Sequence, residues 1–193
     1  MKAGHHLTEN EIQEENDWVD RARRDPRQFG KLYDRYFEGI FNFVYRRTDD
    51  EDLADDLTSQ TFLKALSNIH KYEFRGLPFS AWLYRIATNE VYRHFNKRGK
   101  NPIFSIEEER VKELVSESGE ADIEEKVKLV MDVMKDAPSE LVEVLELRFF
   151  EEKNFKEISY ILNITESGAK MRTYRALEKL KKLIQAKPGY GQE

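Results

Sequence analysis

The sequence contains no cysteine, which excludes a disulfide framework, a thiolate zinc site and a cysteine nucleophile. It also lacks any apolar run near the roughly 20 residues that a membrane-spanning helix requires. Its beginning has no apolar core of the kind found in secretory signals. We therefore expect a cytoplasmic protein that is not inserted in a membrane.

Charged and aromatic residues are abundant instead. Of the 193 residues, 36% are charged and 39% are hydrophobic, with 12 Phe, 9 Tyr and 2 Trp. Disordered chains have few aromatic residues, and a chain of this length accommodates one or two domains. The composition therefore indicates small helical domains with well-solvated surfaces and no single large core.

The charges are unevenly distributed along the chain. The net charge of −5, taken alone, argues against a protein that binds nucleic acid. However, residues 82–100 have a net charge of +4 and residues 168–187 one of +6, whereas residues 105–125 have one of −7. Two basic blocks separated by an acidic stretch suggest two contact areas on a polyanion. The alternative is that both blocks are solvated helix faces.

Hydrophobic spacing predicts two helices before residue 74. From Phe29 to Val44, apolar residues recur at intervals of three and four, which is the period of an amphipathic helix. The acidic cluster at residues 49–56 suits the start of a second helix, because carboxylates complement the positive end of a helix dipole.

A loop with aromatic and basic residues precedes a third helix. Gly76 and Pro78 interrupt the helical pattern, and the helix is expected from about Phe79 to Lys97. Aromatic residues beside basic ones suit single-stranded nucleic acid, because rings stack on exposed bases and cations follow the phosphates. The alternative assigns each ring to the core of a small bundle, and Trp82 in particular is expected there.

The helical pattern stops near Gly99 and Pro102. The acidic stretch that follows contains few apolar residues, which predicts a linker that can hold one short helix. Apolar periodicity resumes near Ile123, and Pro138 suits the first turn of a later helix. No internal repeat is present, which excludes a solenoid.

Residues 154–184 contain the strongest local pattern. Asn154 and Glu157 match a capping box at the start of a short helix, and Thr165 can cap a second helix after a tight turn. In that second helix the apolar residues share one face and the opposite face is polar and basic. The opposite face comprises Ser167, Lys170, Tyr174 and Arg175. This arrangement is typical of a DNA-binding helix-turn-helix, with a plain helical hairpin as the alternative.

Both halves of the chain together resemble the extracytoplasmic-function (ECF) sigma factors, the compact class of bacterial sigma subunits. The resemblance extends from about Asp25 to Leu183. In the N-terminal half it rests on Ala-Asp-Asp-Leu (54–57), Phe-Leu-Lys-Ala (62–65), Phe-Arg-Gly (74–76), and Ala-Trp-Leu-Tyr-Arg-Ile-Ala (81–87) with Asn89. In the C-terminal half it rests on Pro138, Leu-Arg (147–148) and Arg-Ala-Leu (175–177). The order and spacing of the motifs match in both halves of the chain. This combined match is more specific than a match in one half alone.

The resemblance implies an all-α fold of two small helical domains joined by an acidic flexible linker. Residues 25–98 would form the sigma region 2 bundle and residues 124–185 the region 4 helix-turn-helix, with residues 99–123 as the linker. Residues 1–24 would be a polar N-terminal extension and residues 186–193 a tail.

By the same resemblance, the chain is expected to bind core RNA polymerase through the β′ coiled coil and the β flap. It would direct the polymerase to specific promoters and open the −10 element, while the acidic linker threads the polymerase. An anti-sigma factor is a further expected partner.

The site residues that the resemblance implies form three groups. The expected core-polymerase contacts are Asp56, Leu57, Ser59, Gln60 and Phe62. The expected −10 contacts are Phe74, Arg75, Leu77, Pro78, Phe79, Arg85, Asn89, Tyr92, Arg93 and Lys97. The expected −35 contacts are Arg148, Ser167, Lys170, Met171, Tyr174 and Arg175. The chain departs from the family at Ser59-Gln60, where a Gln-Glu pair is usual, and at Met171, where a small polar residue is common.

The sequence pattern is also compatible with other classes of protein. A one-component regulator would use residues 25–97 as a sensor or dimerisation domain and would bind DNA without polymerase. An anti-sigma-like module would lack the second DNA-binding domain. An enzyme built on the carboxylates of residues 49–56 is disfavoured because no His or Cys supports them, and a calcium loop would need alternating oxygen ligands and a glycine. We therefore expect no catalytic centre, no cofactor and no metal.

Overall fold

The computed structural model describes residues 7–99, 102, 108, 111–112, 123–135 and 137–185. Every regular element in this part of the chain is helical, as the sequence predicts. The chain forms two compact units, one that contains α1 to α4 and one that contains α6, α7, α9 and most of α8. None of the described helices is long and apolar enough to cross a membrane.

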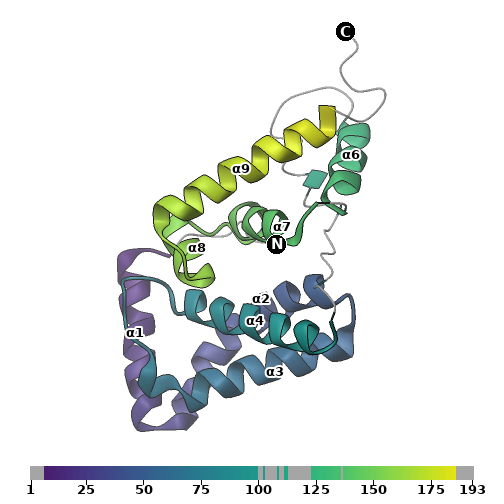
Figure 1. Cartoon of the computed structure of the whole chain (residues 1–193). Coiled ribbons are helices and arrows are strands. Elements are labelled where there is room, and N and C mark those ends of the chain that lie inside the picture. The colour runs from purple at the N-terminus through teal and green to yellow at the C-terminus, as the bar shows by residue number, and fades with distance from the viewer. Residues whose placement is uncertain are drawn as a thin grey trace. The chain divides into compact units, whose positions relative to one another are not determined.

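The first unit consists of α1 (Glu9–Arg24), α2 (Gly30–Thr48), α3 (Glu51–Ser67) and α4 (Phe79–Lys97), with the short 3-10 helices η1 (Pro26–Phe29) and η2 (Ile69–Lys71). Helices α2, α3 and α4 pack against one another, and α1 runs across one end of the three (Figure 1). The predicted third helix is confirmed as α4.

Short-range bonds determine where these helices begin. At α1, the Thr8 hydroxyl accepts the Glu11 amide at 3.3 Å and the Glu11 carboxylate accepts the Thr8 amide at 2.8 Å, which is a capping box. At α3, the Asp50 carboxylate accepts the Leu53 amide at 3.0 Å. Acidic residues fill the first turn of α3, so the prediction that the acidic cluster begins a helix is confirmed.

The core of the first unit is apolar and rich in aromatic rings. Phe29 packs edge-on against Phe62 and Phe79, with ring centroids 6.4 and 6.3 Å apart, a geometry that stabilises aromatic pairs beyond their buried area. Trp82 is half-buried and lies 5.5 Å from the Phe79 ring, so it takes part in this cluster as predicted. Fully buried aliphatic and aromatic side chains complete the core: Leu32, Ile40, Phe43, Leu83 and Val91.

The N-terminal segment differs from its prediction as a polar extension. Residues Glu9–Arg24 form a helix of the first unit, and Val19 and Ala22 are buried in it. The sequence gives little sign of this because so few residues of the segment are apolar. The boundary that we expected at Asp25 therefore separates a helix from the bundle to which it belongs.

The second unit consists of α6 (Ile123–Lys135), α7 (Ser139–Leu145), the π-helical turn η3 (Glu146–Phe150), α8 (Phe155–Leu162) and α9 (Glu166–Gln185). Helices α6 and α7 pack against α9. The centre of this unit is apolar and includes Val127, Val133, Met134, Val144, Leu147, Ile158, Ala169 and Ala176.

Two details of the second unit concern the beginning and the end of α7. Pro138 is the N-cap of α7 and so precedes its first turn. The helix does not continue regularly to Arg148 but widens at η3, where the Glu151 amide donates to the Glu146 carbonyl at 2.9 Å. Such a five-residue bond defines a π-turn, and π-turns are frequent at functional sites.

The predicted linker 99–123 lies mostly outside the described residues, and the predicted tail 186–193 lies wholly outside them. Within the linker, Val111 and Lys112 are helical, and Val111 is buried. Helix α6 begins at Ile123, where the apolar periodicity resumes in the sequence.

Candidate nucleic-acid interface

Two local hydrogen-bonded motifs build the predicted helix-turn-helix. At α8 the Glu157 amide donates to the Asn154 side chain at 2.9 Å and the Asn154 amide donates to the Glu157 carboxylate at 3.0 Å. The predicted capping box is therefore confirmed. At α9 the Gly168 amide donates to the Thr165 hydroxyl at 3.0 Å, which confirms Thr165 as the cap.

The turn between α8 and α9 is tight. Asn163 has a left-handed backbone (φ 55°), a conformation that Asn tolerates better than most residues. The Ile164 amide donates to the Ser159 carbonyl at 3.0 Å across the turn. A side-chain carbon added at Gly168 would lie 3.0 Å from the Thr165 hydroxyl, so glycine leaves that cap undisturbed.

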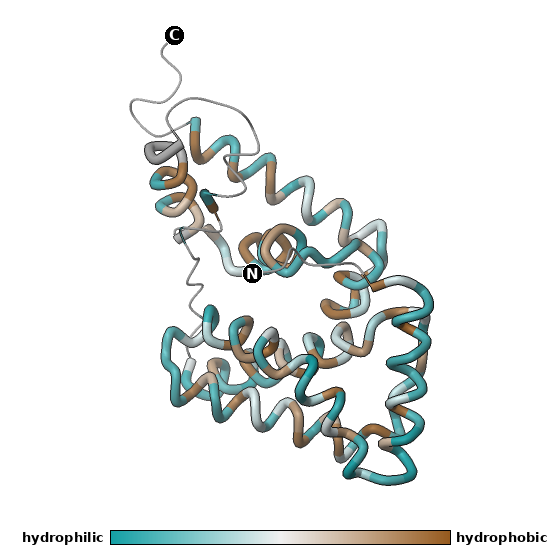
Figure 2. The backbone as a smooth tube through the Cα atoms, turned by 180° about the vertical axis from the view of Figure 1, so that it is seen from behind, coloured by the Kyte–Doolittle hydropathy of each residue, from teal (hydrophilic) through white to brown (hydrophobic). Residues whose placement is uncertain are grey.

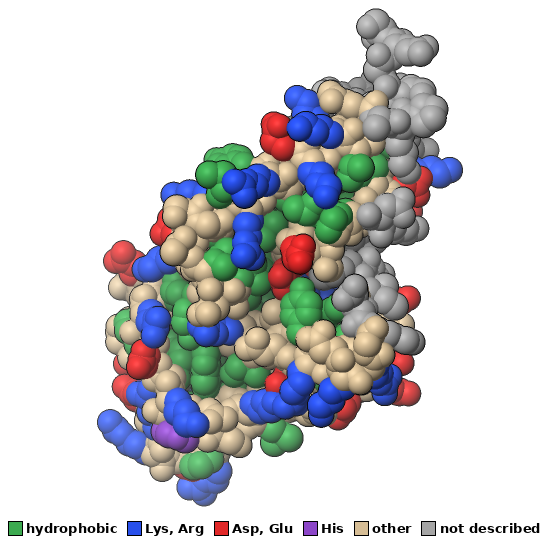
Figure 3. Space-filling view, viewed as in Figure 1, with side chains coloured by type: hydrophobic (Ala, Val, Ile, Leu, Met, Phe, Trp, Pro, Cys, Tyr) green, Lys and Arg blue, Asp and Glu red, His purple; other side chains and the backbone are tan. Residues whose placement is uncertain are grey.

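Helix α9 presents one polar face to solvent. Its buried residues are Ala169, Thr173 and Ala176. On the other side, Met171 and Tyr174 are 52% and 61% exposed. Ser167, Lys170 and Arg175 are exposed as well. Hydrophobic and hydrophilic positions alternate along this helix (Figure 2), and several Lys and Arg side chains lie along it (Figure 3).

The ring of Phe155 brings two predicted −35 residues together. The Arg148 guanidinium lies 5.1 Å and the Lys170 ammonium 5.8 Å from its centroid, within reach of cation–π attraction. Arg148 also donates to the Lys153 carbonyl at 3.1 Å, and Lys170 pairs with Glu166 at 3.3 Å. Sequence reasoning missed Phe155, because the contact joins η3, α8 and α9 only in three dimensions.

One apolar residue of α9 that the sequence pattern assigns to the buried face is exposed. Leu177 is 37% exposed, although its spacing from Ala169 and Thr173 placed it with the buried residues. Leu180 and Ile184 are half-buried. Towards its C-terminal end, α9 therefore contributes less to the core than its pattern indicates.

In the first unit, the loop between η2 and α4 separates into outward and inward residues. Phe74 is 42% exposed, and Arg75 is exposed and paired with Glu73 at 2.8 Å. Leu77 and Phe79, in contrast, are only 7% and 1% exposed. The latter two belong to the core of the unit, and their predicted place at a base-holding surface stays a prediction.

Gly76 lies between these two sets of residues. Its φ of 62° lies in the left-handed region, which glycine adopts without steric cost. Pro78 follows as the residue before α4 and is half-buried.

Helix α4 carries most of the other predicted −10 residues. Asn89, Arg93 and Lys97 are exposed and recur every four residues, which places them on one face of the helix. Arg85 and Tyr92 are half-buried. Lys and Arg side chains are visible in Figure 3 over the part of the first unit where α3 and α4 lie.

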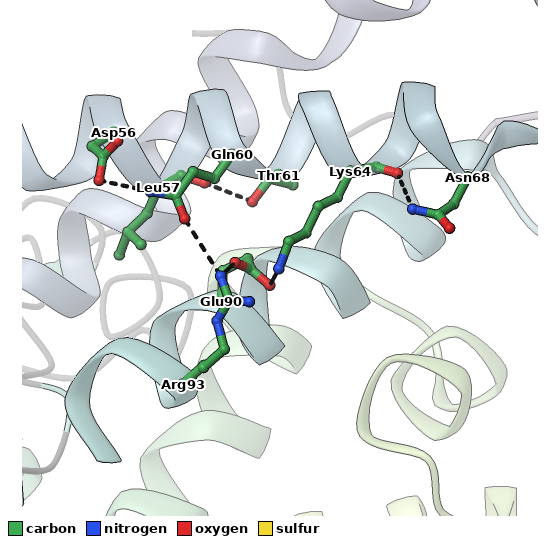
Figure 4. A network of polar contacts seen from close by, with 8 residues as sticks. All are labelled: Asp56, Leu57, Gln60, Thr61, Lys64, Asn68, Glu90 and Arg93. Atoms are coloured by element: carbon green, nitrogen blue, oxygen red, sulfur yellow. Dashed lines mark hydrogen bonds and ion pairs between the residues drawn. The ribbon is translucent and has the colours of Figure 1, made fainter. Parts of the chain in front are cut away.

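A polar network joins this face of α4 to α3 (Figure 4). Glu90, 4% exposed, forms ion pairs with Lys64 and Arg93. Arg93 also donates to the Gln60 side chain at 3.5 Å, and Gln60 donates to Asp56 at 2.8 Å. Arg93 is therefore held in place by acidic and amide groups, and its charge is partly balanced within the protein.

The predicted core-polymerase residues of α3 lie on two different faces. Asp56 and Ser59 are exposed and Gln60 is half-buried. Leu57 and Phe62 are 2% and 3% exposed, so their side chains face the interior of the unit, and their contact with core polymerase stays a prediction.

The sequence reasoning missed the apolar residues that are exposed near that helix. Leu63 on α3 is 64% exposed, and Tyr33 and Tyr45 on α2 are each 39% exposed. Tyr33, Phe37, Phe41 and Tyr45 follow one another every four residues along α2, with adjacent ring centroids 5.0 to 6.2 Å apart. The sequence could not show that these side chains are exposed, since apolar residues at helical spacing are assigned to a core.

No group of three or more His, Cys, Asp or Glu side chains that could hold a metal ion occurs among the described residues. The chemistry that the surfaces offer is hydrogen bonding, stacking and positive charge. These are the interactions by which proteins bind phosphates and base edges.

Comparison with known proteins assigns both units. Residues 32–101 match the model of Sigma-70 region 2, and residues 138–182 match that of Sigma-70, region 4. The RNA polymerase sigma factor YlaC of Bacillus subtilis is 31% identical over 156 residues, which cover 78% of this chain and 88% of the relative. The ECF RNA polymerase sigma factor SigM of the same organism is 29% identical over 155 residues, which cover 79% of this chain and 93% of the relative.

The chain belongs to the ECF sigma factors. A further relative is the ECF RNA polymerase sigma factor BldN of Streptomyces coelicolor, 31% identical over 173 residues, and the match spans 86% of this chain and 64% of BldN. As a sigma factor, the protein acts with RNA polymerase in promoter recognition and transcription initiation. The match to region 2 begins at residue 32, so α1 of this sigma factor precedes it.

Solved structures support the same fold for the sigma factor. CnrH in complex with the cytosolic domain of CnrY has a TM-score of 0.57 at 21% identity, covering 88% of this chain and 96% of the other. The sigma factor RpoE in complex with the anti-sigma factor NepR from Bartonella quintana has a TM-score of 0.57 at 19% identity, covering 82% of this chain and 97% of the other.

Proposed function

We propose that this ECF sigma factor divides promoter binding between its two units, with α9 in the major groove at the −35 element and the first unit at the −10 element. The observation that carries this proposal is the helix-turn-helix, whose caps and exposed polar face lie in a chain that also matches region 2. The major groove of DNA admits a single α-helix, which supports the use of α9 there.

At the −35 element, the exposed face of α9 supplies the contacts. Arg175 and Tyr174 extend from the middle of the helix, where neither is buried, and arginine pairs well with guanine edges. Arg148 and Lys170 beside Phe155 form a compact cationic pair suited to a phosphate. Met171 supplies an exposed apolar surface of the kind that contacts a thymine methyl group.

At the −10 element, the exposed residues of the loop and of α4 receive the opened strand. Phe74 offers a ring on which a base can stack. Asn89 offers one acceptor and two donors to a base edge. Arg93 and Lys97 lie one and two turns further along the same face, where they can follow the phosphates.

The polymerase-binding surface combines α3 and α2. Asp56, Ser59 and Gln60 supply polar groups, and the exposed Leu63 lies on the same helix. The aromatic series on α2 extends this surface with half-exposed rings. Aromatic side chains are enriched in protein interfaces, and an exposed apolar patch often marks such an interface.

Several further assignments belong to the same proposal. The protein acts in the cytoplasm, has no catalytic centre and uses residues 99–123 as the linker between its domains. We include an anti-sigma factor among its partners, because the sigma factor RpoE, which has the same fold, was solved in complex with the anti-sigma factor NepR.

The proposal is tested by reconstitution with core polymerase. Promoter binding and transcript starts are measured with the protein alone, with core alone and with both, on promoters with an intact or scrambled −35 or −10 element. We expect weak binding by the protein alone and specific initiation only with both components. Tight sequence-specific binding without core would instead indicate a one-component regulator.

A further inference from the structure

Helix α1 contacts the chain on both sides of the loop formed by residues 73–78. Figure 1 shows the segment between α3 and α4 running beside α1. This helix precedes the residues that match region 2. Two of its charged side chains make these contacts: Glu15 bonds to the start of α4, and Arg23 bonds to the segment before the loop.

Glu15 takes the place of a missing cap at α4. The residue before that helix is Pro78, which has no side-chain oxygen and makes no capping bond. Instead, the Phe79 amide donates to the Glu15 carboxylate at 2.9 Å. A carboxylate at this end of a helix also complements the dipole, so a residue 64 positions away along the sequence performs the task of an N-cap.

The other oxygen of Glu15 is held in turn. The Arg35 guanidinium lies 3.1 Å from it, and the Tyr36 hydroxyl donates to it. Glu15 itself is only 1% exposed. A carboxylate that is buried and fixed by three donors cannot turn away from the start of α4 without leaving polar groups unpaired.

Arg23 holds the segment that leads into the loop. Its Nε donates to the Ile69 carbonyl at 3.2 Å, and its guanidinium also donates to the Tyr72 carbonyl. Asp20, one turn earlier on α1, pairs with the same guanidinium at 2.7 Å. The planar guanidinium can make all three bonds at once, which a lysine at this position could not do in the same way.

These contacts place a fixed point at each end of the loop. Glu15 and Arg23 are eight residues apart, which corresponds to about 12 Å along one helix, and they bind residues 79 and 69–72. The exposed Phe74 and Arg75 lie between these points. A loop whose ends are fixed loses less conformational entropy when it binds a ligand.

We propose that Glu15 and Arg23 are positioning residues that hold the 73–78 loop ready to receive an unpaired base of the promoter. The proposal rests on the assignment of that loop to the −10 element. In this proposal α1 contributes to strand opening indirectly, because it positions the loop that receives the base.

The first experiment measures amide hydrogen exchange in the full-length protein. Glu15→Ala is expected to raise exchange at the start of α4 and in the loop by roughly 5- to 30-fold, the range for loss of a helix cap, while the rest of α4 stays protected. Glu15→Gln keeps an oxygen for the Phe79 amide and should restore most of the protection. Loss of protection throughout the first unit would overturn the proposal in favour of a general role in stability.

The second experiment measures strand opening with core polymerase, by permanganate reactivity of −10 thymines. Glu15→Ala and Arg23→Ala should reduce reactivity several-fold at unchanged core affinity, with Glu15→Gln close to wild type. The matched controls are Glu14→Ala and Arg24→Ala, which change exposed neighbours on the same helix. Normal opening by both α1 variants would overturn the proposal.

An Asn89→Ala arm separates this proposal from the −10 assignment on which it rests. If Asn89→Ala impairs opening and the α1 variants do not, the positioning role fails alone. If Asn89→Ala and both α1 variants open the promoter normally, the assignment of the loop and α4 fails as well.

Discussion

A single carboxyl group, that of Glu15, shows how strongly the local environment acts on one residue. Burial raises the pKa of Glu15, while the Tyr36 hydroxyl, the Phe79 amide and the Arg35 charge oppose that rise. The charge of Glu11 adds to it. Because the folded state holds the proton of this group more tightly than the unfolded chain, protonation of Glu15 is coupled to stability.

This coupling predicts a pH dependence of unfolding. Above pH 4.5, the ordinary pKa of a glutamate, the folded protein retains the Glu15 proton after the unfolded chain has lost it. This contribution to the free energy of unfolding therefore falls as pH rises from 4.5 through the folded-state pKa. Denaturant titrations between about pH 4 and 8 should show the fall in wild type and in Glu14→Gln, and should show it reduced in Glu15→Gln. A parallel dependence in all three proteins would contradict the shift.

Asn89 provides a test of function at the same scale. Its side chain is exposed, so Asn89→Ala should change the free energy of unfolding by no more than about 0.5 kcal/mol. Core affinity should also be retained, because Asn89 lies outside the proposed polymerase-binding surface. The variant should lose discrimination at the −10 element and show few permanganate-reactive thymines. Wild-type reactivity would remove Asn89 from the site.

At the scale of one element, α3 uses two faces for two purposes. Leu57 and Phe62 stabilise the bundle from the inside, whereas Asp56 and Leu63 face outward. Phe62 lies 4.9 Å from the Tyr33 ring and 6.1 Å from the Phe37 ring. Phe62 thus supports from beneath the aromatic series of α2 that we assign to polymerase binding.

Leu57 and Leu63 of α3 should therefore respond oppositely to truncation. Leu57→Ala should lower the free energy of unfolding by about 2–5 kcal/mol, because it leaves a cavity. Leu63→Ala should leave stability within about 0.5 kcal/mol of wild type but raise the Kd for core polymerase roughly 5-fold or more. Denaturant unfolding and a core-binding titration measure the two effects, with the exposed Ser67→Ala as control. Unchanged core affinity of Leu63→Ala would place the docking surface elsewhere.

Variants of α9 and of Arg148 can distinguish contacts to DNA bases, which give sequence selectivity, from contacts to phosphates, which do not. Arg175→Ala should weaken binding to an intact −35 element by about 1–3 kcal/mol and relax selectivity at one base pair if it contacts a base. Lys170→Ala should behave in the same way if its side chain reaches a base, and should weaken binding uniformly if it meets phosphate. Arg148→Ala, beside the Phe155 ring, should weaken binding evenly across sequences, as loss of a phosphate contact does. Holoenzyme binding to −35 variants distinguishes these effects, with Lys181→Ala, near the end of α9, as control. Normal transcription by all three variants would show that α9 has been misassigned.

At the scale of the whole molecule, charge is segregated along the sequence. The strongly acidic residues 105–125 separate two basic blocks, so the net charge of −5 conceals two areas suited to DNA. Proteins that bind DNA commonly depend on such local charge more than on the total.

The acidic segment is also where we expect the chain to be cut. A glutamate-specific protease should cleave within residues 105–125, which have little apolar content, before it cleaves the glutamates of α1. The products should be two folded fragments, identified by mass spectrometry and circular dichroism. Equal or faster cleavage in α1 would contradict the division of the chain at this linker.

Features that depend on residues within about four positions of one another were determined by the sequence alone. The start of α3 in the acidic cluster, the capping box of Asn154 and Glu157, and the cap at Thr165 are of this kind. Each arises from side chains bonding to nearby backbone groups, so no distant contact is needed to specify it. The polar face of α9 follows equally from helical spacing.

Only the tertiary structure decided which side chains remain available for function. It buried Leu57, Phe62 and Phe79 and exposed Leu63, although their spacing made them all alike as apolar helix residues. It also brought α1 to the loop through Glu15, because the Phe79 amide needed an acceptor that Pro78 cannot provide. Burial and such long-range partners depend on how separate helices pack, and a local pattern holds no record of that packing.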